Sequence, residues 1–200
     1  TFHLKPSRFK RVFVGSDDNV FYPRLVNQQE KFIVYFHGTY IPLQGIEYII
    51  SAAKILENQP DIEFRLLGKG QTFPKIKKLA EELNINNIKF LEPVVYERLP
   101  EYLAQADIVL GIFGKTAKAG RVIPNKVFEA LAMQKAVITE DSPAIRELLT
   151  DGQNVRFCQS ANAQDLAEKI LELQKKNSEL FESLNASDAA SIKSLDENEL

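Results

Sequence analysis

The sequence predicts an α/β domain with a mainly parallel β-sheet, and three observations support this. Between Lys31 and Glu140, short apolar runs alternate with segments whose apolar positions recur at helical spacing. The short runs are rich in β-branched and aromatic residues, which favour strands. Two of them end at glycine, where a tight turn is expected. Alternation at this spacing indicates parallel strands joined by crossover helices, hence a doubly wound, Rossmann-like sheet covered on both faces.

Five segments are predicted to be strands because each is a short apolar run between turn signals. In chain order they are Phe32–Phe36, Glu63–Leu67, Ile88–Leu91, Asp107–Ile112 and Ala136–Thr139. The first ends at Gly38 and the second at Gly68-Lys69-Gly70. With the alternation between them, these runs lead us to expect a sheet of about six strands.

The segments between the strands have helical patterns. From Gly45 to Leu56, the apolar positions fall on one helical face. Further helices are expected through Ile76 and Leu83, at Pro100–Gln105, from near Pro124, from Ser142-Pro143 and beyond Gln164. Ser142-Pro143 is a suitable N-cap and first-turn pair for a helix.

The two ends of the chain differ from the middle. We expect residues 1–25 to be a lead-in segment and residues 26–184 to form the domain. Residues 185–200 are expected to be a polar tail, poor in aromatic residues, that frays or needs a partner. The chain begins at Thr1 and its one methionine is Met133, so we expect a piece of a longer protein.

Composition excludes several classes of function. A length of 200 residues suits one domain, and a formal net charge of −2 gives no basic field, so no nucleic-acid partner is expected. Cys158 is the one cysteine, which excludes a disulfide framework and fits a reducing compartment, so we expect a cytoplasmic protein. No apolar run approaches the roughly 20 residues of a membrane span. No metal site is expected, because no His, Cys and carboxylate cluster has ligand spacing.

Ligands of doubly wound sheets bind beyond the carboxyl ends of the strands, so residues that follow strands are the candidates. The first candidate segment is His37-Gly38-Thr39, where glycine lets a phosphate approach backbone N–H groups; a plain turn is the alternative. The second is Gly68-Lys69-Gly70. It is not a dinucleotide fingerprint, because Phe73 stands where the third glycine belongs, and it supports only a tight turn.

The third candidate is the loop and helix start that follow Asp107. No acidic residue occurs between Asp107 and Glu129, whereas four cations do, which suits an anionic ligand: Lys115, Lys118, Arg121 and Lys126. Gly114-Lys115-Thr116 is not a phosphate-binding P-loop, because Val109 stands where its first glycine belongs and no helix follows directly.

The helix expected from Pro124 carries one carboxylate on an otherwise apolar surface. Pro124 suits the first helical turn, whose free N–H groups form an anion site. Glu129 either pairs with a neighbouring cation or holds hydroxyl groups of a ligand, and the pattern leaves both open. His37 is expected to be a packing residue rather than a catalyst, and Cys158 a small core residue.

Six motifs, in order, carry a resemblance to a known family. They are Phe36-His37-Gly38, Gln44-Gly45-Ile46-Glu47, Leu67-Gly68-Lys69-Gly70, Phe90–Val94, Tyr102–Asp107 and Pro124–Ala132. From about Val12 to Leu173 the chain resembles the C-terminal domain of a group 1 glycosyltransferase, a retaining GT-B enzyme of family 4. The resemblance implies a nucleotide-sugar donor-binding domain at 26–184, with 1–25 as the connection from an absent N-terminal acceptor domain.

The resemblance also implies roles for individual residues. Glu129 corresponds to the glutamate that binds the ribose hydroxyls, and Gly38 to the glycine of the first phosphate-side loop. Pro93 and Val94 lie where the family frames the base, and Lys126 resembles a Pro-x-Lys variant that places a cation near the diphosphate. The full set of expected donor-binding residues is Gly38, Thr39, Gly68, Pro93, Val94, Arg121, Pro124, Asn125, Lys126 and Glu129. No catalytic residue is assigned.

Three residues depart from the family pattern. Thr39 stands in place of an arginine and Gln44 in place of a lysine that hold the diphosphate, and Arg121 replaces the first of two glutamates. Either a working subfamily has rearranged its phosphate site, or the domain has lost catalysis.

The expected function is retaining transfer of a sugar, of the hexosyltransferase type, from a nucleotide-diphosphate sugar to a saccharide or lipid-linked saccharide. No metal or other cofactor is expected, and this fragment alone is expected to be inactive. The alternative is a non-catalytic nucleotide- or phosphosugar-binding module. Contact with the inner membrane face through the absent domain is left open.

Overall fold

The computed structural model describes residues 12–26, 29–153 and 155–196, with side chains described up to residue 179. Parts of the predicted lead-in segment, residues 1–11, and of the polar tail, residues 197–200, lie outside the described residues.

The described residues form one six-stranded sheet in which every pairing is parallel. The strands are β1 (Phe32–His37), β2 (Ile62–Leu67), β3 (Ile88–Leu91), β4 (Ile108–Leu110), β5 (Ala136–Glu140) and β6 (Arg156–Cys158). Their order is β3-β2-β1-β4-β5-β6, so the direction of strand addition reverses between β1 and β4. Such a reversal places a ligand-binding crevice beyond the carboxyl ends of these two strands. The predicted doubly wound, Rossmann-like α/β fold is confirmed.

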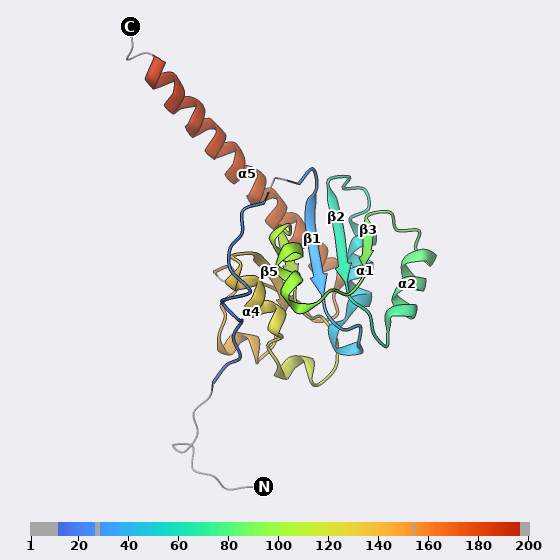
Figure 1. Ribbon diagram of the computed structural model, residues 1–200. Coiled ribbons are helices and arrows are strands. Elements are labelled where there is room, and N and C mark those ends of the chain that lie inside the picture. Colours follow the sequence, from blue (N-terminus) through green and yellow to red (C-terminus); the bar gives the residue numbers. More distant parts are fainter. Residues whose placement is uncertain (1–11, 27–28, 154, 197–200) are drawn as a thin grey trace.

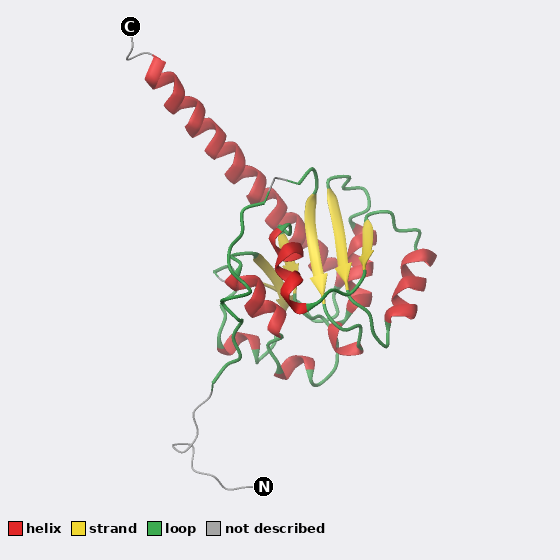
Figure 2. Ribbon diagram, in the orientation of Figure 1, coloured by secondary structure: helices red, strands yellow, loops and turns green. Residues whose placement is uncertain are grey.

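Helices cover both faces of the sheet (Figures 1 and 2). They are α1 (Ile46–Ile55), α2 (Phe73–Glu82), α3 (Leu99–Ala104), α4 (Asn125–Ala132) and α5 (Ala163–Asp196). Helices α1, α2 and α5 pack on the face that carries Val34 and Phe36, whereas α3 and α4 pack on the face that carries Ile33 and Tyr35. Because side chains alternate along a strand, the continuous apolar run of β1 fills both cores.

The two ends of the described chain behave differently. Residues 12–25 of the lead-in segment lie along the side of the domain that carries α4 (Figure 1), and Phe21 anchors them there, being 1% exposed in the α3–α4 core. At the other end, α5 packs on α1 and then projects away from the sheet (Figure 1). The polar segment that begins at residue 185 is helical as far as Asp196.

Two elements differ from the prediction. The prediction of a helix from Ser142-Pro143 is wrong beyond one turn, because only the 3-10 helix Ile145–Glu147 forms. Ser142 Oγ does accept a hydrogen bond from Ile145 N–H, at 3.3 Å, but the chain soon turns at Gly152 (φ 77°) to enter β6. Strand β6 was not among the five predicted runs, since it has three residues and starts with Arg156.

Candidate functional site

Three segments meet at the carboxyl edge of the sheet, where the strand order reverses. They are the loop after β1, the loop after β2 and the start of α4. Tyr40 N–H donates to Lys69 O at 3.0 Å, which holds the first two loops together. A Cβ atom added to Gly38 would lie 3.0 Å from Lys126 Nζ, so the start of α4 faces the same glycine.

Glycine is required where the loops after β1 and β2 touch. Gly68 has φ 131°, and a Cβ atom there would collide with the carbonyl oxygen of Gly38. Gly70 has φ 154°, and its Cβ atom would lie 2.7 Å from the backbone nitrogen of Tyr40. Residues other than glycine rarely adopt such φ values. The two glycines of Gly68-Lys69-Gly70 therefore allow the backbones of the two loops to approach each other closely.

Lys126 is a buried cation beside the loop after β1. It is the second residue of α4 and is 5% exposed. Its Nζ donates to Gln44 Oε1 at 2.7 Å and lies 3.7 Å from the centre of the Phe36 ring. Burial lowers the pKa of Lys126 well below its usual value, and the charge of Glu129 only partly opposes this. An amide and an aromatic face thus hold an ammonium group that has no carboxylate partner among the described residues.

Glu129 lies one turn further along α4 and is 6% exposed. Its Oε2 is 2.8 Å from Nε2 of His37, the last residue of β1. Burial lowers the pKa of His37, against the opposing effect of its hydrogen bond to Glu129. The partner of Glu129 in the described part of the chain is therefore a neutral imidazole, and no ion pair with Lys126 forms there.

The His37–Glu129 pair was missed in the sequence. His37 is buried and packs as expected, with its ring 5.5 Å from that of Tyr35, but it also bonds a residue 92 positions away. The available signal was that a buried carboxylate in an apolar helix needs a polar partner, and a histidine at the end of a strand can supply one.

The other predicted residues lie in loops and at the start of α4. Thr39, Pro93 and Asn125 are exposed, and Val94 is half-buried against the α3–α4 core. Pro124 is the N-cap of α4 rather than a first-turn residue, because its backbone is extended (φ −72°, ψ 145°). Its carbonyl accepts from Val127 N–H at 3.0 Å, which leaves the N–H groups of Asn125 and Lys126 without a helical acceptor.

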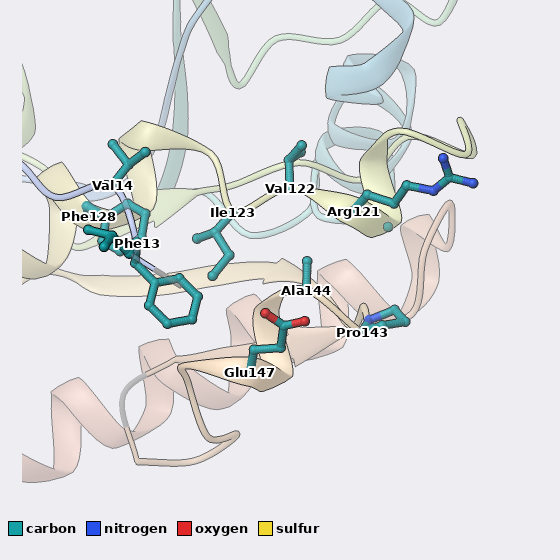
Figure 3. Close-up of a pocket in the computed structure, with 11 residues that line it drawn as sticks. Phe13, Val14, Arg121, Val122, Ile123, Phe128, Pro143, Ala144 and Glu147 are labelled. Atoms are coloured by element: carbon teal, nitrogen blue, oxygen red, sulfur yellow. The ribbon is translucent and has the colours of Figure 1, made fainter. Parts of the chain in front are cut away.

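The four cations predicted between Asp107 and Glu129 differ in their surroundings. Lys115, Lys118 and Arg121 are exposed, in contrast to Lys126. Arg121 lies at the rim of a separate cavity of about 540 Å³ and points away from its centre (Figure 3). This cavity is lined mainly by apolar residues of the lead-in segment and of the chain around α4, and Glu147 points into it.

Within one turn of α4, the site combines groups that suit two different parts of a ligand. Lys126 and the free N–H groups of the helix start can bind an anion. Glu129 can accept hydrogen bonds from hydroxyl groups. In the described residues, no cluster of three or more His, Cys, Asp or Glu side chains could hold a metal ion. Nor does any described helix combine the length and the apolar character needed to cross a membrane.

Comparison with known proteins places this geometry in context. The sequence matches the family described as "Glycosyl transferases group 1" over residues 20–189. It is 30% identical over 137 residues to the putative colanic acid biosynthesis glycosyl transferase WcaI of Escherichia coli, an alignment that covers 68% of this chain and 33% of WcaI. The chain spans about a third of the length of the curated relatives that it matches.

Two solved structures share the fold. The C-terminal domain of LpcC, a group 1 family glycosyl transferase from Francisella tularensis, superposes with a TM-score of 0.69 at 21% identity, covering 80% of this chain and 88% of that one. Alr3699/HepE from Anabaena, solved with UDP and glucose, superposes with a TM-score of 0.72 at 18% identity, covering 84% of this chain and 48% of that one.

Proposed function

The chain belongs to the group 1 glycosyl transferases, and from this premise we propose that it is the donor-binding, C-terminal half of a two-domain GT-B enzyme. The proposed enzyme is a retaining one of family 4 that transfers a hexosyl group from a nucleotide-diphosphate sugar. The acceptor is a saccharide or a lipid-linked saccharide bound by an N-terminal domain. We place the reaction in the cytoplasm, with attachment to the inner membrane face through that domain.

The observation that carries the proposal is the pairing of Lys126 and Glu129 on one face of α4, at the reversal of strand order. Residues three apart in a helix lie on the same side, so an anion at Lys126 and a hydroxyl pair at Glu129 can belong to one ligand. A nucleoside diphosphate has this composition. In our proposal its diphosphate faces Lys126 and Gly38, and its ribose faces Glu129.

The same placement of the ligand indicates which residues contact the base and which groups balance the charge of the diphosphate. Pro93 and Val94 follow β3 at this edge, beside the loop after β2, and we assign them to the base. Lys126 and the free N–H groups at Asn125 and Lys126 supply the positive potential that Thr39 and Gln44 do not. We therefore propose that the donor binds without a metal ion. That Alr3699/HepE was solved with UDP supports a nucleoside diphosphate as the ligand.

A non-catalytic nucleotide-binding module is the second candidate. It is favoured by the replacement of two family cations and one family glutamate, at Thr39, Gln44 and Arg121. Turnover of a nucleotide sugar by the whole two-domain protein separates the candidates, because the module would bind the donor without consuming it.

We expect the chain to bind a nucleoside diphosphate but to transfer no sugar by itself. Binding should be weak, since half of the enclosing surface is absent, and it should be unchanged by EDTA. Transfer should be absent because the acceptor domain closes the cleft, excludes water and positions the acceptor. Calorimetric titration with UDP, GDP and ADP, with and without EDTA, measures the first expectation, and a radiolabelled-donor assay the second. Absence of saturable binding of all three would overturn the proposed function, and transfer by this chain alone would overturn the two-domain account.

A further inference from the structure

The imidazole of His37 makes one hydrogen bond and leaves its second nitrogen buried. Nε2 is 2.8 Å from Glu129 Oε2, whereas Nδ1 is buried without a partner among the described residues. A carboxylate can only accept hydrogen bonds, and a neutral imidazole carries one N–H group. With Glu129 ionised, the proton is therefore on Nε2, and His37 donates to Glu129.

The position of this donor is fixed by the core of the domain. His37 ends β1, a central strand, and its ring lies against that of Tyr35 with an angle of 29° between the planes. The charged groups that face the ring come from α4, namely Lys126 and Glu129. Burial, together with the charge of Lys126, lowers the pKa of His37, so the imidazole stays neutral around pH 7.

Two opposite charges on the same face of α4 are each held by a neutral partner. Lys126 and Glu129 are three residues apart, a spacing at which lysine and glutamate commonly form ion pairs. Here Gln44 takes the ammonium group and His37 takes the carboxylate, so each charge remains available to a ligand. Without the donor at His37, the carboxylate could turn to the ammonium group, and the two would neutralise each other.

We propose that His37 is a positioning residue, which holds the Glu129 carboxylate apart from Lys126 and presents its second oxygen to the ribose hydroxyls. The inference rests on the proposed function, because it takes Glu129 as the ribose ligand. Beyond that function, we assign to His37, a neutral donor on the central strand, the role of keeping two groups apart: Lys126, which binds the diphosphate, and Glu129, which binds the ribose.

The test compares two substitutions of His37. His37→Leu keeps the approximate size but removes the donor, whereas His37→Gln retains an amide N–H that can reach Glu129. We expect His37→Leu to weaken uridine binding about tenfold and His37→Gln to restore most of the loss. Pyrophosphate binding should also weaken in His37→Leu, because Glu129 then pairs with Lys126. It should return to the wild-type value in the double variant His37→Leu/Glu129→Gln, a recovery that a merely structural role would not give.

A ligand-free measurement covers the case in which a variant does not fold. Nitrogen-15 NMR of the wild-type imidazole should show the neutral Nε2–H tautomer of His37 at pH 7, and the Nδ1–H tautomer or a charged ring would overturn the proposal. Unchanged uridine and pyrophosphate affinities in a folded His37→Leu variant would also overturn it. If the wild-type chain binds neither UDP nor pyrophosphate, the proposed function itself fails, and the role of His37 fails with it.

Discussion

Replacing Glu129 by glutamine should weaken the binding of uridine and UDP by roughly 30- to 150-fold, that is by about 2–3 kcal/mol. Glutamine has nearly the same shape, and its Oε1 can still accept the hydrogen bond of His37. The change thus removes the negative charge that strengthens hydrogen bonds from ribose hydroxyls, while the buried contact remains. Calorimetry at pH 7 with uridine, UDP and pyrophosphate measures the effect.

The three ligands separate a ribose contact from a general loss of structure. Pyrophosphate has no ribose, so its affinity should change by no more than about twofold in Glu129→Gln. Glu92→Gln is the matched control, because Glu92 lies at the same edge of the sheet but is exposed and paired with Lys69. Equal losses for uridine and pyrophosphate would contradict the assignment of Glu129 to the ribose.

Replacing Lys126 by methionine should weaken the binding of pyrophosphate but not of uridine, the reverse of what is expected for Glu129→Gln. Methionine retains the buried apolar stem beside Phe36 but removes the ammonium group. Loss of one charge-assisted hydrogen bond to a phosphate should weaken UDP and pyrophosphate binding by about 1.5–3 kcal/mol, while uridine binding should hardly change. Lys118→Met is the control, since Lys118 is an exposed cation of the loop after β4. Loss of uridine affinity to the same extent, or no loss for any ligand, would make Lys126 a packing residue.

The lowered pKa of Lys126 also predicts that the affinity for pyrophosphate depends on pH. Burial lowers the pKa of Lys126 well below its usual value, so the empty site loses its positive charge at a lower pH than an exposed lysine would. Because the charged form binds phosphate, wild-type affinity for pyrophosphate should fall as the pH is raised from 7 towards 10. In Lys126→Met this dependence should be largely absent, and titration of both proteins across this range measures the difference.

Periodicity predicted the sheet because each long strand carries its own signal. The run Phe32–Phe36 is apolar throughout, as a strand buried on both faces must be, and it forms most of β1. Strand β6 carries no comparable signal, because three residues beginning with Arg156 do not make an apolar run. The expected helix from Ser142 failed for a different reason. Its cap residue behaves as predicted, but the chain beyond it must turn into β6.

The site could be predicted only in part, because its contacts join distant segments. The sequence identified Lys126 as one of four cations in a stretch without acidic residues, and Glu129 as the one carboxylate on an apolar helix. It could not identify their partners, since Gln44 is 82 positions from Lys126 and His37 is 92 positions from Glu129. Both partners follow from the fold, which places the end of β1 and its loop against α4. The resemblance to a family did not provide them, because it treats Gln44 as a departure.

Mapping the amide chemical shifts of the isotope-labelled chain during titration with UDP tests most directly where a nucleoside diphosphate binds. The account predicts saturable shifts at Gly38, Gln44, Lys126 and Glu129, which lie on segments far apart in sequence but together at the carboxyl edge of β1. It predicts no more than small shifts at Val122, Ile123 and Ala144, which line the separate cavity of Figure 3. Shifts confined to that cavity, or none at saturating UDP, would contradict the account.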